Sequence, residues 1–180
     1  EAVLTTLPPV SLDLETLLVA PGLLAPRIVC GSMATDLGDG RILSAVDVRK
    51  EFPRSIRESE KIIGANIVFD FGCLAADPEL AAQGILDDIF QAYEEGRVFD
   101  ILIAQALGAI ADGNLFKDPR NGGSLKDPSS GKMTNRYSLA VCTDLVLGRR
   151  DAKKNDFYRL RYGILEQIPM ERWPEEAKQY

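Results

Sequence analysis

Residues 10–18 read VSLDLETLL, and this stretch sets the expected fold of the chain. Apolar and acidic residues alternate through Leu12, Asp13, Leu14 and Glu15, a pattern of period two that predicts a β-strand. Because alternate side chains of a strand point to opposite faces, Asp13 and Glu15 share one face. Two such carboxylates repel each other, and a bound divalent cation would offset the repulsion. Asp-x-Glu alone is also common on exposed strands, so the interpretation needs further residues.

The rest of the chain predicts short strands that come first and are then interleaved with helices. This order indicates an α/β fold with a mixed sheet. The sequence Gly38-Asp39-Gly40 predicts a hairpin turn between two of the strands, and Pro53 predicts a short or kinked helix around it. The further expected strands cover residues 27–34, 41–46, 61–68 and 96–100. The expected helices cover residues 48–60, 70–76, 78–94, 101–111 (apolar and buried), 138–147 and 157–168, with a last helix beginning at 174–180.

Length and composition favour one globular domain over residues 1–180, since 46% of the 180 residues are apolar and 27% are charged. The chain contains no histidine. This excludes chemistry in which the chain itself supplies an imidazole, such as Ser-His-Asp triads and His-ligated zinc. The remaining candidates are carboxylates, Tyr, Lys, Cys or a metal held by oxygen ligands.

The three cysteines, Cys30, Cys73 and Cys142, are scattered and form no CxxC pair. Neither a disulfide framework nor a thiolate zinc site is expected, and Cys30 and Cys73 are predicted to be buried thiols. The apolar stretch at residues 17–26 is interrupted by prolines and a glycine, so it is not expected to span a membrane. The first ten residues lack the basic start of a signal peptide, and a reducing, cytoplasmic setting is expected.

Charge is unevenly distributed along the chain. The net charge of −6, from 21 Lys and Arg against 27 Asp and Glu, argues against a simple polyanion-binding protein. Residues 117–161, however, hold 11 basic and 5 acidic residues, which leaves 10 basic and 22 acidic residues in the remainder. A polyanion could therefore dock on the basic stretch while metals bind the acidic part; solvated loops that happen to be basic are the alternative. Residues 117–136, rich in Gly and Pro, predict one long loop, and such loops are usually functional.

Two further segments carry chemistry. Asn66 and Asp70 lie at the end of the strand expected over residues 61–68, where the chain passes into a helix, a place where α/β proteins put site residues. The alternative for Asp70 is a helix N-cap. The ending WPEEAKQY, residues 173–180, predicts the start of a helix, because Pro suits the first helical position and acidic residues suit the first turn.

Taken in order, these segments resemble the 3′–5′ proofreading exonuclease domain of family A DNA polymerases, and most of all its phage-type branch. LDLETLL is similar to the family's first exonuclease motif, GANIVFD to the second, and RYGILEQIPMERWPEEAKQY to the approach to the third, with Tyr180 in the tyrosine position. The runs VFDILIAQALGAIADG and YSLAVCTDLVLG resemble the helices between motifs two and three. The resemblance covers about residues 12–180 and implies a ribonuclease H-like, mixed five-stranded sheet flanked by helices.

The resemblance also implies a two-metal site that uses Mg²⁺ or Mn²⁺. Asp13 would bridge both ions, Glu15 would ligate the ion that carries the attacking water, and Asp70 would serve the second ion. Tyr180 would orient the water or the scissile phosphate. Oxygen ligands suit these hard cations, in agreement with a chain without histidine.

On the substrate side, the resemblance implies hydrolysis at the 3′ end of single-stranded or frayed DNA with release of a deoxynucleoside monophosphate. Asn66 and Phe69 would support the terminal nucleotide, with Phe69 either packing on it or belonging to the core. Thr16 would hydrogen-bond near the terminal base, or be an ordinary surface threonine. A polymerase domain would follow in the parent chain.

The sequence departs from the family pattern at its end. The family's fourth metal-binding carboxylate would lie four residues after Tyr180, so the chain is expected to be truncated at the third motif, and the fragment itself to be inactive on that account. Three alternatives stay open: an exoribonuclease of the same fold, a catalytically incomplete single-strand-binding or scaffold domain, and an α/β domain whose carboxylates are incidental.

Overall fold

The computed structural model describes residues 7–113, 139–148 and 156–178. The chain divides into two compact units, one made of Glu1–Phe99 with Asn155–Tyr180 and the other of Asp100–Lys154. The first unit contains the sheet and the residues expected to form the site. The second unit contains two helices that contact each other, α5 (Ile101–Ala111) and α6 (Leu139–Leu147).

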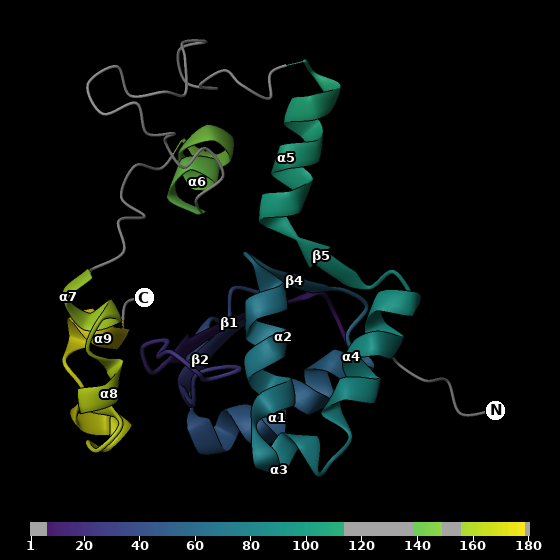
Figure 1. Ribbon diagram of the computed structural model, residues 1–180. Coiled ribbons are helices and arrows are strands. Elements are labelled where there is room, and N and C mark those ends of the chain that lie inside the picture. The colour runs from purple at the N-terminus through teal and green to yellow at the C-terminus, as the bar shows by residue number, and fades with distance from the viewer. Residues whose placement is uncertain (1–6, 114–138, 149–155, 179–180) are drawn as a thin grey trace. The chain divides into compact units, whose positions relative to one another are not determined.

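One mixed sheet of five strands forms the centre of the first unit, in the order β3-β2-β1-β4-β5 (Figure 1). The strands are β1 (Val10–Thr16), β2 (Ile28–Thr35), β3 (Arg41–Ser44), β4 (Ile62–Gly64) and β5 (Val98–Asp100). β2 is antiparallel to both β1 and β3, whereas β1 and β4 are parallel. The expected fold class, a mixed five-stranded sheet flanked by helices, is confirmed.

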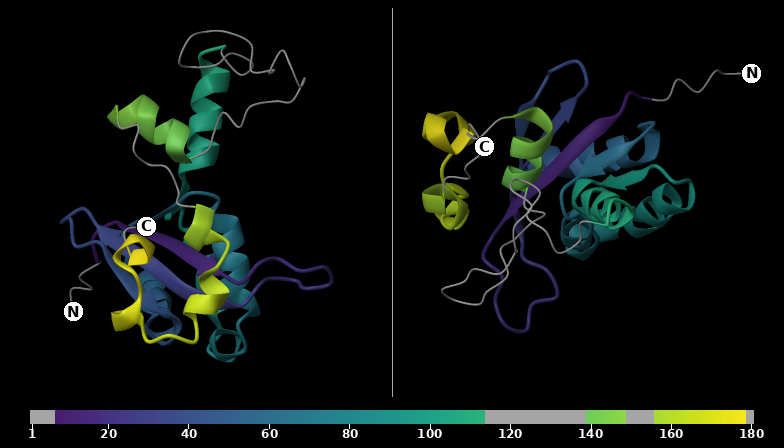
Figure 2. Two further views of the ribbon diagram at one scale, coloured as in Figure 1. Left: turned by 90° about the vertical axis from the view of Figure 1, so that its left-hand side faces the viewer. Right: turned by 90° about the horizontal axis from the view of Figure 1, so that it is seen from above.

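Helices cover both faces of this sheet, as the two views of Figure 2 show. On one side are α1 (Ala45–Glu58), α2 (Ile67–Ala76), α3 (Pro78–Ala81) and α4 (Ile85–Glu94). On the other side are the short C-terminal elements α7 (Asp156–Arg159), α8 (Tyr162–Leu165), η1 (Met170–Arg172) and α9 (Glu175–Lys178).

The alternation of β1 explains why the sheet has a core on each face. Val10, Leu12 and Leu14 are buried in the larger core, together with residues of α1, α2 and α4. A smaller core lies on the opposite face and joins β2 to the C-terminal elements. Its buried members are Val29, Cys30, Tyr162, Leu165, Trp173 and Ala177.

Two expected strands are shorter than the sequence suggested, because a helix begins early in each. The strand expected over residues 41–46 ends at Ser44, whose hydroxyl accepts a hydrogen bond from the Asp47 amide and caps α1. The strand expected over residues 61–68 ends at Gly64. Asn66 then adopts a left-handed conformation, with φ of 65°, and α2 starts at Ile67 instead of Asp70.

The helix predictions need four corrections. The helix expected over residues 157–168 is divided into two short ones, α7 and α8. The single helix expected over residues 78–94 is divided into α3 and α4, because Gly84 has a φ of 78° that a helix does not accept. Pro53 is tolerated inside the 14-residue helix α1, which is longer than expected. The helix expected at residues 101–111 has those bounds, but Ala109 is its one buried residue among the described ones, so the expectation of a buried helix was wrong.

The hairpin at residues 38–40 is confirmed, with the Asp39 carboxylate accepting from the Thr35 amide at 2.7 Å. The long loop predicted at residues 117–136 and most of the basic stretch lie outside the described residues. None of the helices that the structure describes is long and apolar enough to cross a membrane.

Candidate functional site

Asp13 and Glu15 lie on the face of β1 that looks away from the larger core, as the alternation predicted. Both side chains are partly buried. In the antiparallel pairing with β2, Asp13 stands opposite Ser32 and Glu15 stands opposite Cys30. A register irregularity follows between Glu15 and Thr16, so the regular strand ends immediately after the second carboxylate.

The pKa of the buried Cys30 thiol is affected by both carboxylates. Its pKa is raised to about 12, first by burial and then by the negative charges of Glu15 and Asp13. Cys30 therefore stays a neutral thiol at physiological pH, and it brings no third negative charge to this part of the sheet.

Asp70 joins this region from α2 and is itself buried, with 4% of its surface exposed. Its Oδ1 accepts a hydrogen bond from the backbone N–H of Leu14, at 3.3 Å, across 56 residues of sequence. β1 pairs with β4 only at Val10 and Ser11, so further along β1 the carboxylate of Asp70 takes the place of a strand partner. Leu14, the donor of this hydrogen bond, is the residue between Asp13 and Glu15.

The same carboxylate affects a second cysteine. The pKa of Cys73, three residues further along α2, is raised to about 11 by burial and then by the charge of Asp70. Asp70 lies inside the first turn of α2, whereas the N-cap position belongs to Asn66. The alternative that Asp70 is a helix N-cap was therefore wrong.

The residues expected to touch substrate lie around the beginning of α2 and the end of β1. Asn66 is exposed, and its side chain makes no capping hydrogen bond to α2. Phe69 is 38% exposed, so the alternative that it belongs to the core was wrong. The hydroxyl of Thr16 donates to the carbonyl of Leu17 at 2.9 Å, an ordinary local bond.

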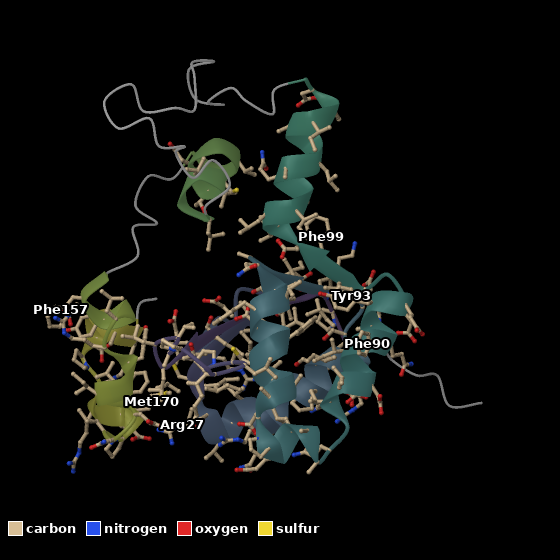
Figure 3. All side chains as sticks on the ribbon, in the orientation of Figure 1. Arg27, Phe90, Tyr93, Phe99, Phe157 and Met170 are labelled. Carbon is tan, nitrogen blue, oxygen red and sulfur yellow. The ribbon has the colours of Figure 1, made fainter. Side chains whose placement is uncertain are left out.

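The C-terminal segment packs on the face of the sheet that carries Asp13 and Glu15. Cys30, the residue opposite Glu15, shares the smaller core with Ala177 of α9. Arg27, which directly precedes β2, forms a salt bridge of 2.6 Å to Glu166 of this segment, and Figure 3 labels Arg27. Tyr180 lies two residues after the last described residue of α9, outside the part that the structure describes.

Among the residues that the structure describes, no three Cys, Asp or Glu side chains are grouped as a metal site requires. The donors do fit hard cations in kind, because Asp13, Glu15 and Asp70 offer carboxylate oxygens. The structure does bring the carboxylate of Asp70 to the backbone of β1, the strand that bears Asp13 and Glu15.

Comparison with known proteins supports the fold. The chain resembles the crystal structure of the Nibbler EXO domain of Aedes aegypti, with a TM-score of 0.54 and 12% sequence identity. The match covers 97% of this chain and 72% of that one. At this identity the likeness establishes that the chain shares the fold of that domain, and nothing finer. No protein-family model matches the chain, and no curated protein matches it.

Sequence reasoning missed two parts of this region, the amide of Leu14 and the thiol of Cys30. The register between β1 and β2 was the signal needed for Cys30, and two short strands alone do not fix that register. The bond between Leu14 and Asp70 follows from where α2 begins, which the sequence placed three residues too late.

Proposed function

We propose that this chain is a metal-dependent 3′–5′ exonuclease domain that hydrolyses the 3′-terminal phosphodiester of DNA and releases a deoxynucleoside monophosphate. In the finer form of the proposal it is the proofreading domain of a family A DNA polymerase. The fold shared with an EXO domain supports the coarse class. The motif resemblance, from Asp13 to Tyr180, supports the finer one.

One observation carries the proposal: the buried carboxylate of Asp70 is bonded to the backbone of Leu14, between Asp13 and Glu15. A buried carboxylate is costly unless something offsets its desolvation. This carboxylate lies next to the strand that carries two more carboxylates, Asp13 and Glu15. A cation shared by the three would offset both the desolvation of Asp70 and the repulsion between the like charges.

Asp13, Glu15 and Asp70 would hold Mg²⁺ or Mn²⁺, which when bound supplies an activated water and stabilises the leaving oxygen. The chain's own contribution is positioning. The bond to Leu14 ties Asp70 to β1, and Cys30 beside Glu15 remains uncharged.

Two exposed residues at the start of α2 would contact the terminal nucleotide of the substrate. Phe69 offers an aromatic surface to a base, and Asn66 offers an amide that can donate and accept. Both lie at the beginning of the helix that carries Asp70, Asn66 as its N-cap residue and Phe69 in its first turn, so contacts with a terminal nucleotide would hold its phosphate close to the carboxylates. Tyr180 would then act on the water or the phosphate, as the resemblance to the third exonuclease motif implies.

The test uses the parent chain continued past Tyr180, so that it includes the fourth metal carboxylate that the resemblance implies, and a single-stranded DNA labelled at its 3′ end, with Mg²⁺. Mononucleotide release that is lost in Asp13→Asn and in Asp70→Asn, but kept in Asp36→Asn, is the expected result. Asp36 is an exposed acid in the β2–β3 turn and serves as the matched control. Calorimetry with Mn²⁺ measures metal binding separately. An RNA of the same sequence distinguishes the exoribonuclease alternative.

A second candidate, a single-strand-binding domain without catalysis, is favoured by one observation. The described residues contain no group of three acidic side chains arranged for a metal. DNA binding without mononucleotide release, unchanged by Mn²⁺ and by Asp13→Asn, would support this candidate over the nuclease.

A further inference from the structure

Helix α4 carries apolar residues on two sides, and only one of them faces the core. The buried side consists of Ile85, Ile89 and Ala92. A second row is exposed and consists of Leu86 (48%), Phe90 (58%) and Tyr93 (42%). Its spacing of four and then three residues places the row along one side of the helix, where a surface helix normally carries polar residues (Figure 3).

Helix α2 extends this apolar surface. The rings of Phe71 and Tyr93 meet edge to face, with their centroids 5.8 Å apart, and so join the two helices. Val68, one turn before Phe71, is 60% exposed. A Cβ added at Gly72 would meet nothing within 4 Å, so the surface is open there. The one charged residue of α2, Asp70, is buried, so the exposed side of this helix is uncharged. Exposed apolar patches of this kind mark interaction sites.

An acidic row runs beside the apolar one. Asp87 and Glu94 are both exposed and lie seven residues apart, as Leu86 and Tyr93 do. Within the described part of the chain, neither acid takes part in a salt bridge. The neighbouring acids are already paired, Asp88 with Arg57 at 2.9 Å and Glu95 with Arg97 at 2.6 Å.

The stability of α4 explains only one member of the acidic row. Asp87 lies in the first turn, where a negative charge interacts favourably with the helix dipole. Glu94 lies in the last turn, where the interaction is unfavourable, and α4 has no basic residue there. The charge of Glu94 therefore does not stabilise the helix, and a basic group outside the helix would interact with it favourably.

We propose that this face of α4, with Leu86, Phe90 and Tyr93 flanked by Asp87 and Glu94, binds an amphipathic helix of a partner protein. The partner helix would have an apolar row with Lys or Arg beside it, as in paired helices whose flanking charges select the partner. A second copy of this chain fits less well. An antiparallel pair of α4 helices would bring Asp87 of one copy towards Glu94 of the other, and like charges there are unfavourable.

Two designed helical peptides test the proposal against the whole 180-residue chain, with fluorescence anisotropy as the measurement. Both have the same leucine row, flanked by lysines in one peptide and by glutamates in the other. We expect the lysine peptide to bind more tightly. The double variant Asp87→Lys and Glu94→Lys should weaken its binding roughly two- to thirty-fold and favour the glutamate peptide, since exposed ion pairs contribute about 0.2–1 kcal/mol each. Phe90→Asp should weaken both peptides about tenfold or more.

Two exposed positions outside this face provide matched controls: Asp36→Lys for the charge change and Leu24→Asp for the apolar residue, which is 97% exposed. Neither should change the binding of either peptide. Equal binding of the two peptides, or a preference that the double variant does not reverse, would overturn the proposal. So would a concentration-dependent dimer that Phe90→Asp dissociates, because the face would then belong to a second copy.

Discussion

The side chain of Asp70 and the backbone amide of Leu14 form a hydrogen bond of 3.3 Å that links α2 to β1. Asp70 is buried, and Leu14 points its own side chain into the larger core. The bond therefore fixes the carboxylate of Asp70 relative to a strand whose other side holds Asp13 and Glu15. A change at Asp70 should affect both stability and the proposed chemistry, and different substitutions should separate the two.

Asp70→Ala should destabilise the chain by about 1–3 kcal/mol, because it leaves the buried amide of Leu14 without its acceptor. Asp70→Asn should cost less, since the amide oxygen can still accept the bond, but it should lose Mn²⁺ affinity and nuclease activity to the same extent as Asp70→Ala. Urea unfolding measures the first effect, and calorimetry and mononucleotide release measure the second. Equal loss of stability in both variants would mean that the charge of Asp70, and not the hydrogen bond, stabilises the fold.

Gly31→Ala should destabilise the sheet by about 1–3 kcal/mol, as overpacking of a core does. A Cβ at Gly31 would lie 2.9 Å from both Phe52 Cζ and Val48 Cγ2 and 3.2 Å from the carbonyl oxygen of Asp13. Relief of the clash would move α1 or the segment of β1 that bears Asp13, so metal binding should weaken as well.

Gly72→Ala is the matched control for Gly31→Ala. It lies inside α2, where an added Cβ meets nothing within 4 Å. Thermal unfolding should show a gain of about 0.4–1 kcal/mol, because alanine favours the helix over the unfolded chain. A loss of stability in Gly72→Ala comparable to that in Gly31→Ala would contradict the steric explanation.

The sequence predicted β1 well because its alternation is strict, and the face shared by Asp13 and Glu15 follows from it. It predicted the beginning of α2 poorly. Nothing in the pattern shows that Asn66 takes a left-handed conformation and ends the strand expected over residues 61–68. A Cβ at Gly64 would lie 2.9 Å from Ile67, so the early turn depends on a close local approach that glycine permits. The periodicity of apolar residues does not report such a steric requirement, and the bond from Leu14 to Asp70, 56 residues apart, depends on where that turn lies.

Asp77 should make the stability of the fold depend on pH. Burial raises the pKa of its carboxyl group, but the Arg49 guanidinium and the amides of Leu80 and Glu79 outweigh this and hold the pKa below its ordinary value of 3.8. A carboxyl group whose pKa is lower in the folded state stabilises the fold above the unfolded-state pKa and loses that effect as pH falls through the folded-state value.

Asp77→Asn isolates this charge, because asparagine is as good an N-cap for α3 as aspartate. We expect the variant to be less stable by about 1–2 kcal/mol near neutral pH, from the loss of a partly exposed pair with Arg49. The difference should shrink as the pH falls below about 4. Urea unfolding at a series of pH values measures it. A difference that stays constant down to pH 2 would show that the ion pair with Arg49 is not its source.

Trp173 should hold the C-terminal segment on the face of Asp13 and Glu15. Its indole N–H donates to the carbonyl oxygens of Leu165, at 3.0 Å, and Ile168, at 2.8 Å. Its ring lies 6.0 Å from that of Tyr162, whose hydroxyl donates to the carbonyl of Ala177 at 3.4 Å. Trp173→Phe keeps an aromatic ring and removes the donor, and should cost about 1–2 kcal/mol.

Hydrogen exchange distinguishes a local role of Trp173 from a global one. In Trp173→Phe, the amides of residues 162–177 should exchange faster while those of β1 and β2 change little, because the segment has its own small core and can open separately. The same variant also tests the role of Tyr180. If Tyr180 acts at the site, Trp173→Phe should lower the turnover and leave the substrate affinity nearly unchanged, because Trp173 holds the segment that leads to Tyr180 and does not hold Asp13 and Glu15. Tyr158→Phe, in a partly buried ring of the same segment, is the control. Uniformly faster exchange over the whole sheet would instead assign Trp173 to the stability of the fold alone.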